Sequence, residues 1–104
     1  MRIKDTALLS ALKLYYDECE ITGETSRLHL HHVILKSQGG DDLRENILCV
    51  AGWLHDDYHQ ARKEARYMIA RHVATLRPDV ALYVSEKLGS EDAYEWWLEQ
   101  HGVR

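Results

Sequence analysis

The sequence predicts an α+β, mostly helical fold in one small domain of 104 residues. Two short apolar segments, 28–35 and 46–50, flank a glycine-rich loop and indicate an antiparallel pair of strands. Apolar residues at spacings of three and four predict helices before and after this pair. Hydrophobic residues make up 45% and charged residues 29% of the chain, as in soluble globular proteins. No apolar run approaches the roughly 20 residues that span a bilayer, which excludes a membrane protein.

The amino-terminal half is predicted to contain one helix and the two strands. Residues 5–17 form an amphipathic helix behind Asp5, a favourable N-cap residue. A turn containing Gly23 follows, and the segment LHLHHVIL at 28–35 is a short strand with interleaved histidines. Residues 37–42 are a loop because paired glycines favour irregular backbone. Residues 46–50 return antiparallel to the first strand.

The carboxy-terminal half is predicted to be helical throughout. Residues 53–76 form one long helix that ends before Pro78. One face of this helix is apolar and contains Tyr58, Ala61, Ala65, Ile69, Val73 and Leu76. Residues 79–88 form a second helix that ends at Gly89, and Ser90 caps a third with an acidic first turn. Residues 79–101 are thus a helical extension of the domain.

Five of the seven histidines fall between positions 29 and 59. His55 and His59 are four residues apart on a helix, so both imidazoles can reach one ion about 2.1 Å away. His31 and His32 are adjacent on a strand and point to opposite sides. One of them can therefore join the helix pair on a metal while the other lies beside it. An ion with three histidine ligands, open positions and a free imidazole nearby suits metal-assisted hydrolysis.

Several segments in this order resemble the HNH endonuclease family, particularly its small phage-type members. They are CEITG at 19–23, LHLHHV at 28–33, GGD at 39–41, Asn46, and the pair His55 and His59. The resemblance covers about residues 15–62, with the motif core at 19–62. It implies a ββα-metal fold in which two strands and one helix hold a single divalent ion over the scissile phosphate.

The resemblance also implies a role for each motif residue. His31, His55 and His59 are the expected metal ligands, and His32 is the expected general base. Asn46 is the middle residue of the motif, which braces the loop and keeps the base in orientation. The ion itself stays open among Mg²⁺, Mn²⁺, Ni²⁺ and Zn²⁺, although three imidazoles favour the last three.

The structural zinc that many small HNH proteins carry is predicted to be absent. Cys19 has Thr22 where a second cysteine would stand, and Cys49 is two residues out of place. Four zinc ligands therefore cannot be assembled. Apolar packing is expected to close that end of the domain around Ile21, Ala51, Trp53 and Leu54. Two cysteines are also too few for a disulfide framework, which favours a cytoplasmic location, the host cytoplasm if the protein is phage-encoded.

The predicted activity is metal-dependent hydrolysis of DNA by a nicking or weakly specific endonuclease. Net charge is −4, but residues 60–78 carry five basic residues against Glu64 alone. Phosphate contacts are expected from Lys36 and Arg44 beside the glycine loop and from Arg62, Lys63 and Arg66, which would continue the His55–His59 helix. So few basic residues predict weak, salt-dependent binding. By resemblance, the partner besides DNA would be a phage terminase or another large protein.

Two other functions are compatible with the sequence. The first is a non-catalytic DNA-binding module that keeps the metal as a folding staple, since metal binding can stabilise a small fold directly. The second is an interaction module whose acidic carboxy-terminal helices, with Trp96 and Trp97, dock a larger enzyme.

Overall fold

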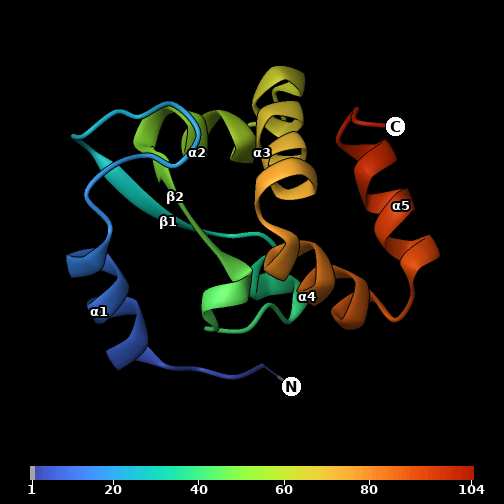
Figure 1. Cartoon of the computed structure of the whole chain (residues 1–104), viewed down its shortest axis with the longest axis horizontal. Coiled ribbons are helices and arrows are strands. Elements are labelled where there is room, and N and C mark those ends of the chain that lie inside the picture. Colours follow the sequence, from blue (N-terminus) through green and yellow to red (C-terminus); the bar gives the residue numbers. More distant parts are fainter. Residues whose placement is uncertain (1) are drawn as a thin grey trace. The chain divides into compact units, whose positions relative to one another are not determined.

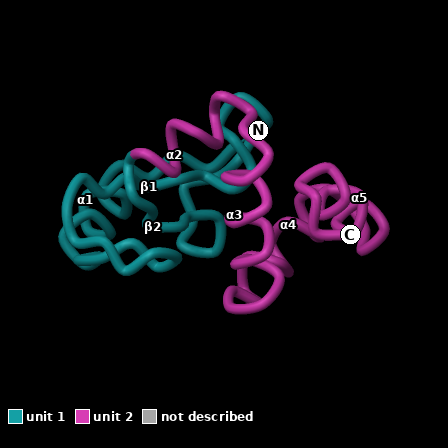
Figure 2. Tube along the Cα trace, turned by 90° about the horizontal axis from the view of Figure 1, so that it is seen from above, with its two compact units in different colours: residues 1–52 teal, residues 53–104 magenta. Residues whose placement is uncertain are grey.

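The computed structural model describes residues 2–104, which form five α-helices and one two-stranded antiparallel sheet (Figure 1). This confirms the α+β, mostly helical class. The chain divides into two compact units, the first ending at Gly52 and the second beginning at Trp53 (Figure 2). No helix within residues 2–104 is long and apolar enough to cross a bilayer.

The first unit contains helix α1 and both strands. Helix α1 spans Thr6–Tyr15, and the Asp5 side chain caps it by accepting from the Leu8 amide at 3.0 Å. Strand β1 (Leu28–His32) pairs antiparallel with β2 (Ile47–Ala51), as predicted. Every residue of β2 is buried, so this strand is the core of the first unit.

The loop between the strands folds back on itself through two 3₁₀ turns, η1 (Lys36–Gln38) and η2 (Arg44–Asn46). The two glycines inside it serve different purposes. Gly39 has a φ of +85°, a conformation that glycine adopts without steric cost. A Cβ on Gly40 would lie 1.6 Å from the Ile34 carbonyl oxygen, so no larger residue fits there. The paired glycines therefore allow the loop to close tightly.

The predicted single helix over 53–76 is wrong, because the structure has two helices there. Helix α2 spans Gly52–His59 and α3 spans Lys63–Leu76. Between them Ala61 has a φ of +59°, the Ala61 amide donates to Tyr58 O at 3.1 Å, and the Arg62 amide donates to Asp57 O at 3.0 Å. This pattern is a Schellman cap, which usually has glycine at the left-handed position. Alanine there gave no sequence signal for the end of α2.

The second unit continues with α4 (Pro78–Leu88) and α5 (Glu91–Gln100), close to their predicted limits. Pro78 is the first residue of α4, and the Ser90 hydroxyl caps α5 by accepting from the Ala93 amide at 3.1 Å. Its core consists of buried side chains from four helices: Leu54, Tyr58, Ala65, Ile69, Ala70, Val73, Val80, Tyr83, Val84, Trp97 and Leu98.

Three aromatic or aliphatic positions differ from the expected packing. Trp53 is 47% exposed, so it does not join the apolar cluster predicted for it, whereas Ala51 and Leu54 are buried. Leu76, at the end of the predicted apolar face, is also exposed. Trp97 is buried and Trp96 is exposed, so only Trp96 is available to contact a partner.

Candidate metal centre

Helix α2 presents a pair of histidines suited to one metal ion. His55 and His59 are one turn apart, and their Nε2 atoms are 3.0 Å apart. Two nitrogens that each lie about 2.1 Å from one ion at a right angle are separated by about 3 Å. The observed spacing therefore fits two ligands of a single ion. His55 is half-buried and His59 is exposed, which leaves the pair open to solvent on one side.

His31, the third ligand that the resemblance implies, lies on β1 in the first unit, whereas His55 and His59 lie on α2. The His31 side chain is fully buried within the paired region, opposite Leu48. A donor set made of imidazoles suits a divalent ion such as Zn²⁺ or Ni²⁺.

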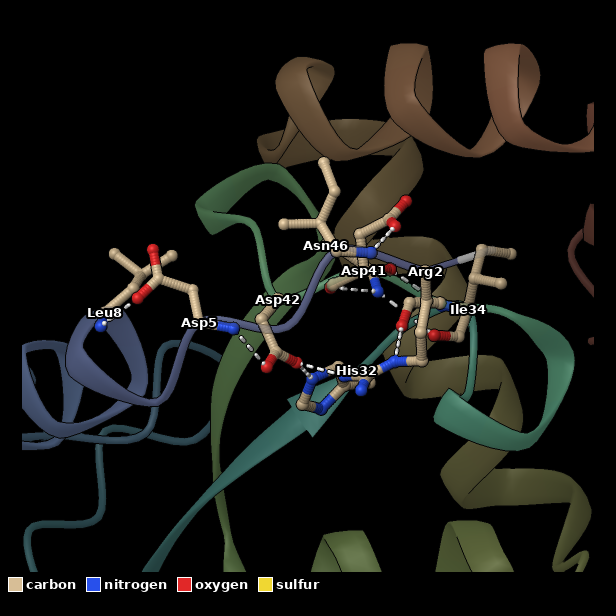
Figure 3. A network of polar contacts seen from close by, with 10 residues as sticks. Arg2, Asp5, Leu8, His32, Ile34, Asp41, Asp42 and Asn46 are labelled. Atoms are coloured by element: carbon tan, nitrogen blue, oxygen red, sulfur yellow. Dashed lines mark hydrogen bonds and ion pairs between the residues drawn. The ribbon is translucent and has the colours of Figure 1, made fainter.

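His32, the predicted base, is bound to an acid that the sequence analysis did not single out. Its Nε2 lies 2.8 Å from Asp42 Oδ1, and both side chains are buried (Figure 3). Burial lowers the pKa of His32, although the hydrogen bond to Asp42 opposes this. His32 is therefore neutral at neutral pH, the form that can accept a proton.

Asp42 is held by the amino-terminal segment. Oδ2 accepts from the Asp5 amide at 2.8 Å, and the Arg2 guanidinium donates to Oδ1 (Figure 3). Burial acts to raise the pKa of Asp42, but the Asp5 amide, the His32 ring and the Arg2 charge together lower it below its ordinary value. Asp42 is thus an ionised carboxylate, and hydrogen bonds together with the Arg2 charge compensate its burial.

Asn46 ties the two ends of the loop together. It is fully buried; Oδ1 accepts from the Ile34 amide at 2.8 Å, and Nδ2 donates to Ile34 O and Asp41 O at 3.0 Å each. All three partners are backbone groups of the loop that follows β1. The Asn46 amide therefore fixes the backbone between the His32 and Asp42 segments.

The acids after the glycine pair are what sequence reasoning missed. Asp41 and Asp42 are both buried, and Asp41 Oδ1 accepts from the Ile3 amide at 2.6 Å. Arg2 adds a bond from Nε to Gly40 O at 2.7 Å. Two adjacent acids in a loop usually indicate a solvated turn, and the only available signal was their position between the glycines and Asn46.

The five predicted phosphate contacts have different surroundings. Lys36, Arg44, Arg62 and Lys63 are exposed, and Arg66 is half-buried. The guanidinium carbon of Arg44 lies 5.2 Å from the centre of the Tyr15 ring, and that of Arg66 lies 5.0 Å from the centre of the Tyr58 ring. These stacked positions orient two of the five charges.

The turn at Ala61 changes the placement of three of these residues relative to the histidine helix. The expectation that Arg62, Lys63 and Arg66 continue the His59 helix is wrong. Arg62 caps α3, and Lys63 is its first residue. Lys63 and Arg66 also line an open pocket of about 630 Å³, together with Tyr67 and His101.

Both cysteines are buried thiols. The Thr22 amide donates to Cys19 Sγ at 3.3 Å, and the Gly23 amide donates to Cys19 O at 2.9 Å. A tight turn thus surrounds Cys19, and hydrogen bonds stabilise it. Burial raises the pKa of the Cys49 thiol to about 11, so the thiolate that binds metal is disfavoured there.

Comparison with known proteins found no matching family model, curated protein or solved structure.

Proposed function

We propose that this protein is a divalent-metal-dependent endonuclease of the HNH type, which hydrolyses phosphodiester bonds in DNA. The observation that carries the proposal is the pair His55 and His59 on α2, whose Nε2 atoms are 3.0 Å apart. We propose His31 as the third ligand of the same ion, as the resemblance implies. A fourth histidine, His32, is adjacent to one of these ligands and is neutral at neutral pH. Three metal ligands with a base beside them suit a hydrolytic metal site. A structural metal usually has a fourth protein ligand, which leaves no open position.

In this mechanism His32 is the base that accepts a proton from the attacking water. A ring nitrogen of His32 takes a proton from water, and the water oxygen forms a bond to phosphorus. The bond from phosphorus to the 3′ oxygen breaks, and the 3′ oxygen takes up a proton from a solvent water molecule. The ends left are a 5′-phosphate and a 3′-hydroxyl. A bound divalent ion supplies Lewis-acid stabilisation of the charge on the phosphate oxygens.

Two features of the chain support weak and non-specific binding of DNA. The basic residues proposed to contact phosphate are few: Lys36, Arg44, Arg62 and Lys63 are exposed and Arg66 is half-buried. Arg62 caps α3 and Lys63 is its first residue. Phosphate contacts of this kind position a protein on DNA without reading its sequence. We therefore propose nicking or weakly specific cleavage, with a larger partner such as a terminase directing the enzyme to its site.

Plasmid nicking tests this function directly. Metal-stripped protein is given Mg²⁺, Mn²⁺, Ni²⁺ or Zn²⁺ singly, beside His32→Ala and His72→Ala. His72 is a buried histidine outside the site and controls for loss of a histidine. We expect cleavage with at least one ion and a loss of about 10²–10⁴ in rate for His32→Ala only.

The other outcomes separate the alternatives. No cleavage with any ion, together with a large rise in melting temperature on metal addition, would identify a metal-stapled binding module. Equal cleavage by wild type and His32→Ala would refute His32 as the base.

A further inference from the structure

We infer that Asp42 is a positioning residue that fixes which nitrogen of His32 takes the proton. The role of His32 as a base rests on the proposed nuclease function, whereas the tautomer of its ring follows from the hydrogen bonds alone. The geometry comes entirely from the first unit, where His32, Asp42 and the amino-terminal segment contact one another (Figure 3).

The hydrogen bonds around Asp42 determine the tautomer of His32. The Asp42 carboxylate accepts from the Arg2 guanidinium and the Asp5 amide, and neither of these groups can accept a proton in return. An ionised carboxylate can only accept hydrogen bonds. The nitrogen that lies 2.8 Å from Asp42 Oδ1, His32 Nε2, must therefore carry a proton. In the neutral ring the lone pair then lies on Nδ1, which is the atom able to receive a proton from water.

The surroundings of Asp42 keep this arrangement rigid. The Asp42 side chain is 4% exposed, so water does not compete for its carboxylate oxygens. The Asp42 amide donates to Ile3 O at 2.8 Å, which ties the same residue to the amino-terminal segment by its backbone as well. Residues 2–5 thus form a clamp on the acid. An imidazole whose tautomer is fixed by an acid on one nitrogen is the arrangement that makes histidine an efficient base in other hydrolases.

Asp41 provides a matched control. It is adjacent to Asp42, equally buried and also bonded to the clamp, through the Ile3 amide at 2.6 Å. Asp41 Oδ1 bonds the Ile3 amide, whereas Asp42 Oδ1 bonds His32, so Asp41→Asn removes a comparable charge and leaves the histidine partner in place. Asp42→Asn keeps the shape of the acid and allows an amide N–H to face His32 Nε2, which favours the proton on Nδ1.

The first measurement reads the tautomer without any activity. Nitrogen–proton correlation spectra of ¹⁵N-histidine-labelled protein, with one equivalent of diamagnetic Zn²⁺ and at about pH 8 where histidine is neutral, distinguish the protonated ring nitrogen. We expect wild type and Asp41→Asn to carry the proton of His32 on Nε2, and Asp42→Asn to lose that preference. A wild-type His32 protonated on Nδ1 would overturn the inference.

The second measurement uses plasmid nicking over a range of DNA concentrations, which gives kcat and KM separately. Asp42→Asn should lower kcat about 100-fold or more, as loss of correct general-base catalysis does, while KM changes less than about threefold because the buried acid is out of reach of DNA. Asp41→Asn should leave kcat within about threefold of wild type. Equal losses in both variants would mean a structural role and refute the inference. If wild type cuts no DNA with any ion, the proposed function fails, and the tautomer spectra alone decide whether Asp42 fixes His32.

Discussion

Substitution of Asn46 by alanine should destabilise the protein strongly, because it removes a fully buried and fully hydrogen-bonded side chain. The amide makes three hydrogen bonds to loop backbone, at 2.8, 3.0 and 3.0 Å, and is fully buried. A buried hydrogen bond contributes about 1 kcal/mol net, and a partner left unsatisfied costs more. The expected loss in free energy of unfolding is therefore about 3 kcal/mol, a large fraction of the 5–15 kcal/mol typical of domains.

Urea unfolding of Asn46→Ala followed by circular dichroism, with the linear extrapolation to zero urea, gives this quantity. Ser37→Ala is the matched control, because Ser37 is an exposed residue of the same loop; it should stay within about 0.5 kcal/mol of wild type. We also expect slower DNA cleavage by Asn46→Ala, since the loop it ties carries the partner of His32. A loss below about 1 kcal/mol with normal cleavage would refute the bracing role.

Two further predictions concern the second unit. Ala61→Gly should raise the free energy of unfolding by about 0.5–1 kcal/mol, because Ala61 occupies the left-handed region at φ +59°, where glycine has no Cβ penalty; unchanged or lower stability in urea would contradict this. His101 should make stability depend on pH. Burial lowers its pKa, while Nδ1 bonds Trp97 O and Nε2 bonds the Tyr58 hydroxyl, each at 2.7 Å. The unfolded chain then binds the proton more readily than the folded one, so the contribution of His101 is complete above about pH 6.5 and is lost as pH falls below that value. Melting temperatures between about pH 5 and 8 should therefore fall less steeply on the acid side for His101→Gln than for wild type; parallel curves would exclude this role.

The sequence was sufficient to predict features that depend only on residues close together in the chain. Asp5 and Ser90 cap α1 and α5 because a side-chain oxygen reaches an amide three residues ahead, which needs no tertiary contact. The strand pair followed from apolar runs around a glycine loop. The spacing of His55 and His59 predicted that their nitrogens face each other, because helix geometry alone places residues four apart on one side.

Two features could be known only from the tertiary structure: the end of α2 and the hydrogen-bond partner of His32. The end of α2 lies at an alanine with positive φ, and alanine is the residue most favourable to helix continuation, so the sequence indicated the opposite. The partner of His32 is an acid whose charge is compensated by Arg2 and by the Asp5 amide, about 40 residues away in the chain. The sequence by itself therefore determined which side chains carry the candidate chemistry. Folding decided how His32, the proposed base, is held. Burial and long-range hydrogen bonds set its tautomer and its pKa, and both exist only once the chain has closed around Asp42.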